Sequence, residues 1–257
     1  MKYYGGCDVG STYTKAVILD ENGKICADTT IRSKINSEVS AKLAMEEVLN
    51  KVGLNSSEEL GYLIGTGYGR NKVPFADENI SEISCHAMGV HVTDPSVKAI
   101  IDIGGQDVKG ISIDTDGTVK NFAMNDKCAA GTGRFLEIMA DRLGITQQQM
   151  ADLARSGEPT KISSMCTVFA ESEVISLIGR GEPRENIARG VIESVVSRVA
   201  TMAGQAEGAP YYLTGGLCEN TYVVERLAAL LGSPVTTSPQ ARFAGAIGAA
   251  IRARALN

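Results

Sequence analysis

The sequence lacks the features that mark membrane-spanning, exported and nucleic-acid-binding proteins. No apolar run approaches the roughly 18 residues that cross a bilayer. The N-terminal stretch MKYYGGCDVGSTYTK contains no continuous apolar segment of the kind found in a signal peptide. The formal net charge is −5, and Arg180, Arg184 and Arg189 are interspersed with glutamates instead of forming a basic patch. We therefore expect a cytoplasmic protein that binds neither a membrane nor nucleic acid.

The cysteines form no Cys-x-x-Cys pair and no closely spaced framework. They are Cys7, Cys26, Cys85, Cys128, Cys166 and Cys218. Disulfides are not expected in a cytoplasmic chain, because that compartment keeps thiols reduced. Each cysteine is therefore expected to be either a small buried hydrophobe or a metal-binding or catalytic thiol.

The most informative feature that the chain does contain is an internal sequence repeat. CDVGSTYTKAVILD at 7–20 and IDIGGQDVKGISID at 101–114 each predict a strand, an Asp-x-Gly turn and a second strand, with a third strand after them. Helical periodicity follows, over 40–52 in the first half and from 133 onward in the second, where the last two predicted helices cover 217–231 and 242–254. We expect two related α/β domains: residues 1–94, completed by a C-terminal helix at 242–257, and residues 95–241.

Both turns carry side chains suited to binding phosphate. Glycines let backbone N–H groups approach anionic oxygens, carboxylates can hold Mg²⁺ directly or through water, and Gln106 can position an attacking water. A third glycine pair ends the strand predicted near 211–214 and offers a place for adenosine. The candidate residues for ATP or ADP are Asp8, Gly10, Ser11, Thr12, Lys15, Asp102, Gly104, Gly105, Gln106, Asp107, Gly215 and Gly216. Two such turns facing each other across a cleft would form an ATP site.

Two common nucleotide motifs are absent. No GxxxxGK followed by Ser or Thr comes after Gly10, and GTGYGR has Arg70 where a dinucleotide-binding motif needs its last glycine. The three glycine turns instead resemble the actin, sugar-kinase and heat-shock-chaperone ATPase superfamily. That resemblance implies an α/β fold of two ribonuclease-H-like domains that close on ATP. Cys7 stands where an aliphatic residue is usual in that superfamily, and it is expected to pack as a small hydrophobe.

Cys128 and Cys166 each precede a predicted helix, at 133–143 and 170–178. The N–H groups and partial positive charge of a helix N-terminus favour a thiolate or an anionic iron–sulfur cluster. Two cysteines cannot supply the four thiolates that a cluster usually takes, but a two-fold homodimer can. From spacing alone, two inert cysteines or a zinc site recruiting His86 or His91 remain open.

Four longer motifs extend the resemblance. MNDKCAAGTGRFLE (124–137), CTVFAESEVIS (166–176), SEISCHAMG (81–89) and IDIGGQD (101–107) resemble the activators of 2-hydroxyacyl-CoA dehydratases and the related ATPase subunits of benzoyl-CoA reductases. The resemblance implies an ATPase from anaerobic metabolism, with one 4Fe–4S cluster per homodimer ligated by Cys128 and Cys166. It also implies an electron taken from ferredoxin or flavodoxin and passed to a dehydratase or reductase.

The remaining expectations concern coupling and alternatives. ATP is expected to close the two domains and reorient the helices that follow Cys128 and Cys166. Glu171 is a second candidate for assisting hydrolysis, although a carboxylate in the first turn of a helix is also favoured by the helix dipole. The competing interpretations are a small-molecule kinase of the same superfamily and a non-enzymatic iron–sulfur or nucleotide sensor.

Overall fold

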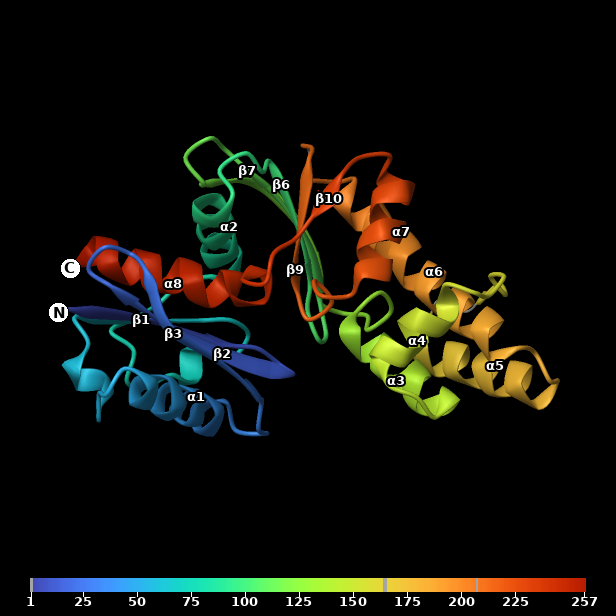
Figure 1. Ribbon diagram of the computed structural model, residues 1–257, viewed down its shortest axis with the longest axis horizontal. Helices are drawn as coiled ribbons and strands as arrows, with labels where there is room; N and C mark the ends of the chain where they lie inside the picture. The colour runs from blue at the N-terminus through green and yellow to red at the C-terminus, as the bar shows by residue number, and fades with distance from the viewer. Residues whose placement is uncertain (1, 164–165, 207) are drawn as a thin grey trace. The chain divides into compact units, whose positions relative to one another are not determined.

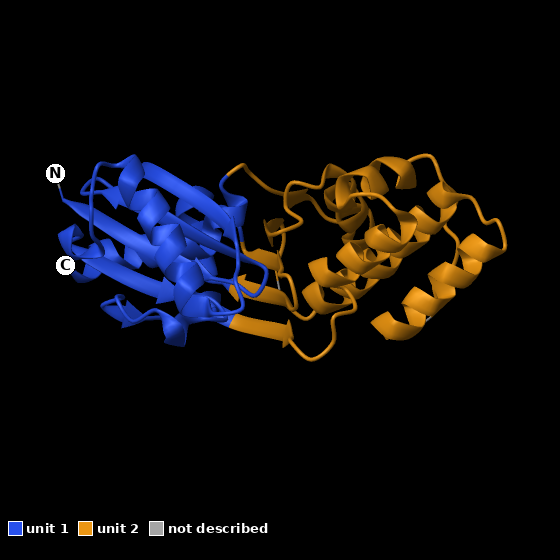
Figure 2. Ribbon diagram, turned by 90° about the horizontal axis from the view of Figure 1, so that it is seen from below, with its two compact units in different colours: residues 1–97, 113–120, 240–257 blue, residues 98–112, 121–239 orange. Residues whose placement is uncertain are grey.

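The computed structural model describes residues 2–163, 166–206 and 208–257, and its chain divides into two compact units (Figure 2). Unit 1 comprises Met1–Val97, Ile113–Lys120 and Gln240–Asn257, and unit 2 comprises Lys98–Ser112 and Asn121–Pro239. The chain forms two five-stranded mixed sheets with helices beside them (Figure 1), so the predicted α/β class is confirmed.

The first sheet has the strand order β3-β2-β1-β4-β5. β1 pairs antiparallel with β2 and parallel with β4, as in a ribonuclease-H-like sheet. The elements of unit 1 are β1 (Tyr3–Val9), β2 (Tyr13–Asp20), β3 (Ile25–Arg32), α1 (Ser37–Lys51), a 3-10 turn (Ser57–Glu59), β4 (Tyr62–Thr66), a 3-10 turn (Arg70–Lys72), β5 (Glu78–Asn79), α2 (Glu82–Thr93), a 3-10 turn (Ala241–Phe243) and α8 (Ala244–Leu256).

Strand β2 explains why the first sheet has helices on both faces. Its side chains alternate, so that Ala16 and Ile18 pack in the cluster formed with α1, whereas Val17 and Leu19 pack against α8. Residues 16–19 of β2 are apolar at every position. Such a run needs two covered faces, because successive side chains point to opposite sides. Cys7 is fully buried in the α1 cluster, as expected for a small hydrophobe.

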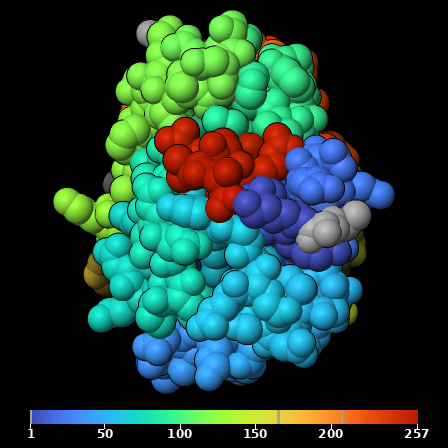
Figure 3. Space-filling model, turned by 90° about the vertical axis from the view of Figure 1, so that its left-hand side faces the viewer, coloured from blue at the N-terminus to red at the C-terminus, as the bar shows by residue number. Residues whose placement is uncertain are grey.

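Glycines let α8 approach β1 and α2 closely. A Cβ at Gly6 would overlap the carbonyl oxygen of Ala246, and one at Gly248 would overlap that of Cys85. Figure 3 shows the end of α8, in red, beside the start of β1, in dark blue. The Asn257 side-chain amide donates to the Gly61 carbonyl over 2.7 Å. The C-terminal helix is therefore an integral part of the unit that contains the N-terminus.

The second sheet repeats the connectivity of the first. Its order is β10-β9-β6-β7-β8, with β6 antiparallel to β7 and parallel to β9. α6 packs against α3, α4, α5 and α7. The elements are β6 (Ala99–Ile103), β7 (Val108–Ile113), β8 (Val119–Asn125), α3 (Gly133–Leu143), α4 (Gln147–Ala154), α5 (Thr167–Gly179), α6 (Arg184–Ala203), β9 (Tyr211–Gly215), α7 (Thr221–Leu231) and β10 (Val235–Thr236). In the described part of the chain, no helix is both long and apolar enough to cross a membrane.

Two helix starts differ from the expectation. α5 begins at Thr167 rather than at residue 170, so Cys166 is its N-cap residue. α7 begins at Thr221 rather than at residue 217, because Asn220 caps it by accepting from the Val223 N–H over 3.1 Å. The shift at α5 matters for the site, because it brings a cysteine directly to a helix N-terminus.

Candidate functional site

The first candidate phosphate turn joins β1 to β2 in unit 1. Asp8 is buried near the end of β1, directly opposite Lys15 in the strand register, and their Oδ2 and Nζ atoms are 3.2 Å apart. The Gly10 N–H donates to the Tyr13 carbonyl over 3.2 Å and closes the turn. The five residues predicted for this turn, Asp8, Gly10, Ser11, Thr12 and Lys15, therefore lie together.

The second candidate turn joins β6 to β7 in unit 2 and repeats that geometry. Asp102 is opposite Lys109, and the Gly104 N–H donates to the Asp107 carbonyl over 2.9 Å. The Lys109 Nζ is 3.1 Å from Asp102 Oδ2 and 2.9 Å from Asp107 Oδ2, and the lysine is only 1% exposed. Gln106 is exposed in this turn.

The third glycine pair lies beside the second turn. β9 runs parallel to β6 with Thr214 opposite Asp102, and the Thr214 hydroxyl donates to Asp102 Oδ1 over 2.9 Å. Gly215 has φ +84°, and a Cβ there would overlap the Ile103 carbonyl oxygen. Gly216 has open space where a Cβ would stand. Gly215 thus serves the close approach of two strands, and Gly216 presents bare backbone at the end of β9.

Sequence analysis missed the counterpart of this pair in unit 1. Thr66 is opposite Asp8 in the parallel register of β1 and β4, just as Thr214 is opposite Asp102. Gly67 has φ +90°, and a Cβ there would overlap Asp8 Oδ1. The signal for it is a Thr-Gly dipeptide at the end of the fourth strand of each half, Thr66-Gly67 and Thr214-Gly215.

Helix α3 is hydrogen-bonded to the second turn. The Gly133 N–H donates to the Gly104 carbonyl over 3.0 Å, and the Arg134 N–H donates to the Gly105 carbonyl over 2.9 Å. The Gln147 side chain, at the start of α4, donates to the Gly133 carbonyl over 3.0 Å. These two α3 N–H groups are therefore already partnered, which corrects the expectation that they are available to Cys128.

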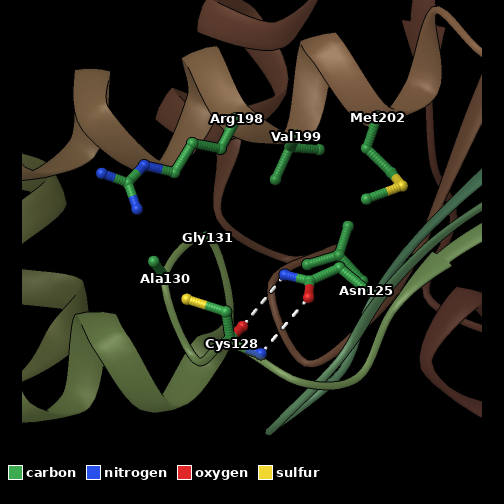
Figure 4. A pocket seen from close by; sticks show the side chains of 8 residues that line it. Asn125, Cys128, Ala130, Gly131, Arg198, Val199 and Met202 are labelled. Carbon is green, nitrogen blue, oxygen red and sulfur yellow. Dashed lines mark hydrogen bonds between the residues drawn. The ribbon is translucent and has the colours of Figure 1, made fainter. Parts of the chain in front are cut away.

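Cys128 lies on the loop between β8 and α3, four residues before the Thr132 N-cap. It is exposed, and both of its backbone polar groups bond to the Asn125 side chain. A cavity of about 200 Å³ adjoins the loop, as Figure 4 shows. The cavity is lined by Val108, Asn125, Cys128, Ala130, Gly131, Arg198, Val199 and Met202.

Cys166 is also exposed, and it stands at the N-terminus of α5, which packs against α3. Its carbonyl accepts from the Ala170 N–H over 2.9 Å, which is the first bond of the helix. Ser164 and Met165, which precede it in the motif, lie outside the described residues. The carboxylate of Glu171 lies 2.5 Å from Arg142 and ties α5 to α3.

The buried cysteines differ chemically from these two. Burial raises the pKa of the Cys85 thiol to about 11, and burial also raises the pKa of Cys7. Both thiols therefore keep their protons at neutral pH. Among the described residues, no three His, Cys, Asp or Glu side chains gather as a metal site would require. His86 and His91 belong to unit 1, whereas Cys128 and Cys166 belong to unit 2.

The two sheets and their duplicated turns define an ATPase of the actin-like fold. Residues 6–253 match the BadF/BadG/BcrA/BcrD ATPase family, and the chain belongs to that family. It is 45% identical over 254 residues to the activator of lactoyl-CoA dehydratase of Anaerotignum propionicum, covering 98% of this chain and 97% of the relative. The resemblance drawn from the cysteine motifs is thereby confirmed.

Solved structures agree with the family assignment. Component A of (R)-2-hydroxyglutaryl-CoA dehydratase from Acidaminococcus fermentans superposes with a TM-score of 0.93 at 41% identity, covering 100% of this chain and 99% of that one. The activator of 2-hydroxyisocaproyl-CoA dehydratase from Clostridium difficile, solved with bound ADPNP, gives 0.93 at 38% identity, covering 99% and 95%. A glucokinase of Streptomyces griseus, at 14% identity and a TM-score of 0.61 over 98% and 99% of the two chains, shares the fold. The predicted superfamily is confirmed.

Proposed function

We propose that this ATPase activates a 2-hydroxyacyl-CoA dehydratase or a related reductase by ATP-dependent transfer of one electron. The observation that carries the proposal is the link between the second phosphate turn and α3, the helix that directly follows the loop of exposed Cys128. A small-molecule kinase needs the phosphate turns but has no use for an exposed cysteine on that loop. The activators among the relatives support the same choice.

The donor set fits a 4Fe–4S cluster shared by two chains. Cys128 and Cys166 are exposed thiols of one unit, and Cys166 stands at a helix N-terminus, whose partial positive charge would stabilise an anionic cluster. One chain offers two of the four thiolates that such a cluster usually takes, and a two-fold homodimer offers four. When bound, the cluster would store and release a single electron at the surface of the protein.

Exposed apolar side chains support a second copy of this chain as the covering partner. They precede Cys128 on β8 and follow Cys166 on α5, and they are Phe122, Met124, Val168, Phe169, Ile175 and Ile178. Apolar surface of this kind commonly marks a protein interface. A homodimer would cover part of this surface and bring the four cysteines together.

The two turns would hold the nucleotide. Gly10 and Gly104 close the two turns with their own N–H groups. Ser11, Thr12 and Lys15 would present backbone and side-chain donors to phosphate, as would Gly105 in the other unit, and Gly216 offers bare backbone for the adenosine. Both Asp102 oxygens already have protein partners, in Thr214 and Lys109. Asp102 therefore suits Mg²⁺ held through water. We assign the positioning of the attacking water to Gln106.

The magnitude of coupling limits what ATP can do to the cluster. A typical coupling free energy of roughly 1–3 kcal/mol corresponds to about 40–130 mV for one electron. Nucleotide would therefore act both by shifting the potential and by controlling when the acceptor enzyme docks. Within unit 2, the Gly133 and Arg134 hydrogen bonds give such a signal a short path from the turn to α3.

The first experiment measures iron and acid-labile sulfide in protein purified without oxygen, beside Cys128→Ala. We expect about four of each per dimer, and their loss in the variant. ATP turnover and reduction by ferredoxin or flavodoxin are then followed in the same preparations. Folded, iron-free protein that phosphorylates an added small molecule would favour a kinase. Intact cluster without ATP turnover would favour a sensor.

A further inference from the structure

One side chain holds both backbone polar groups of Cys128. The Asn125 Nδ2 donates to the Cys128 carbonyl over 3.0 Å, and Asn125 Oδ1 accepts from the Cys128 N–H over 3.3 Å (Figure 4). Asn125 Oδ1 also accepts from the Lys127 backbone N–H over 3.4 Å. Asn125 is the last residue of β8, so its backbone is anchored in the second sheet. The loop is therefore tied to the sheet at the cysteine itself.

The structure assigns Asn125 as the positioning residue of Cys128: its amide fixes the backbone from which the thiolate projects toward the proposed cluster. The inference rests on the proposed function. The asparagine amide carries a donor and an acceptor on one short planar group, so it can bond to the N–H and the carbonyl of the same residue at once. Aspartate keeps the acceptor but would turn a carboxylate oxygen toward the Cys128 carbonyl oxygen. Alanine keeps neither bond.

The cavity beside the loop makes these bonds important. Cys128, Ala130 and Gly131 border about 200 Å³ of space whose opposite wall includes Val199 and Met202 of α6. Close packing would hold a loop in place without polar contacts, but a loop beside a cavity has neighbours missing on one side. The Asn125 bonds supply the restraint that packing does not supply there.

Cys166 needs no equivalent residue. As the N-cap of α5 it has φ −83° and ψ 134°, and its carbonyl is held by the Ala170 N–H at 2.9 Å. Its position is set by a helix that packs against α3 and α6. The two proposed ligands are thus positioned by different means, one by a helix and the other by a single amide, so we expect a change at Asn125 to disturb the Cys128 side of the cluster.

The test compares wild type with Asn125→Ala, Asn125→Asp and the control Asn121→Ala, all purified without oxygen. Asn121 is an exposed residue of the same strand, and its side chain bonds to the adjacent Phe122 N–H rather than to the loop. The readouts are iron per dimer, the rate of iron loss to a chelator, and the electron paramagnetic resonance spectrum of the reduced protein. Thermal melting monitors the fold.

We expect both Asn125 variants to lose iron roughly 10-fold to 100-fold faster than wild type, the usual range for groups that orient metal ligands. Their spectra should also change, whereas Asn121→Ala matches wild type. Iron loss and spectra equal to those of the control would overturn the inference. If Asn125→Ala does not fold, Asn125→Asp, which keeps the volume and the acceptor, decides alone. Wild type without iron would refute the proposed function itself, and this inference with it.

Discussion

The two phosphate turns share one design but are anchored differently. In unit 1, Lys15 pairs with Asp8 and its side chain is 16% exposed, and the Gly10 carbonyl accepts from the Ser33 hydroxyl over 2.7 Å. In unit 2, the Lys109 side chain is 2% exposed and lies between two carboxylates. The carbonyls of the second turn accept from the backbone of α3. The first turn is tied to a strand end, and the second to a helix.

This difference indicates different roles for the two turns. Lys15 keeps partial exposure, so its ammonium can meet a phosphate, whereas Lys109 is enclosed and neutralises Asp102 and Asp107. The second turn cannot move without changing its bonds to α3, because Gly133 and Arg134 donate directly to it. We infer that the first turn mainly binds nucleotide, and that the second both binds it and transmits its state.

Replacing each lysine by methionine tests that division with the largest expected effect. Lys109→Met leaves two carboxylates without their buried partner, so the free energy of unfolding should fall by roughly 3–5 kcal/mol. Lys15→Met should cost less, roughly 1–3 kcal/mol, because it removes one hydrogen bond to a single carboxylate and the lysine that is lost was itself partly exposed to water. Denaturant unfolding without nucleotide measures both losses. ATP titration of folded Lys15→Met should show weakened binding, and equal stability losses would contradict the division.

Adjacent glycines separate a structural role from a binding role. Gly215→Ala forces a side chain onto φ +84° and into the Ile103 carbonyl oxygen, so stability should fall by roughly 1–3 kcal/mol or more. Gly216→Ala enters open space and should unfold like wild type. If the nucleotide lies against Gly216, that variant should nevertheless bind ATP more weakly. Calorimetric titration measures the ATP affinity of the two variants, and thermal melting measures their stability. Unchanged ATP affinity in Gly216→Ala would contradict the placement of adenosine against Gly216.

Much of the fold could be predicted from the sequence, because the duplicated strand–turn–strand pattern is local. The helix over 133–143 was predicted at its observed bounds. The two-residue strands β5 and β10 were not, because two residues carry no periodicity. The start of α5 was placed late, since Thr167 and Val168 are β-branched and disfavour a helix that tertiary packing nevertheless forms.

The candidate site could be predicted in its residue types but not in its connections. Asp8, Lys15, Asp102 and Gly104 are visible in the repeated motif. The backbone hydrogen bond from the Gly133 N–H to the Gly104 carbonyl joins residues far apart in sequence, so no local sequence pattern predicts it. Asn125 lies inside the cysteine motif, but only the folded structure reveals that its amide bonds to both backbone groups of Cys128.

A proline at the start of α3 tests the link between the second turn and the cysteine loop. Gly133→Pro replaces the N–H that bonds to Gly104 with a ring carbon that would overlap the Gly104 carbonyl oxygen, so the turn must move away from α3. The position itself, the first of the helix after the extended Thr132, accepts the proline backbone conformation. The lost hydrogen bond alone contributes roughly 0.5–1.5 kcal/mol, so ATP affinity should change by at least about 2-fold to 10-fold. The effect of nucleotide on the proposed cluster's potential should shrink. The matched control is Ser37→Pro, at the first position of α1 after the extended Asn36, and equal effects of both prolines would contradict the link.

The smallest expected effect concerns one aspartate at the hairpin turn that follows each phosphate turn. Asp20, the last residue of β2 before the turn to β3, is 6% exposed and accepts from the backbone N–H groups of Asn22 and Lys24. Asp116, in the turn between β7 and β8, is exposed and accepts from the Thr118 N–H. These hydrogen bonds lower the pKa of both carboxyls. A lowered folded-state pKa contributes stability above the ordinary value of about 3.9, and that stability is lost as pH falls through the folded-state pKa. Wild type should therefore lose melting temperature as the pH falls from 6 to 2, and Asp20→Asn should lose less of it. The difference in slope should correspond to less than one proton taken up on unfolding. Asp116→Asn should differ from wild type by less still, because water competes for the hydrogen bonds of Asp116. A larger flattening in Asp116→Asn would mean that burial does not rank these two turns.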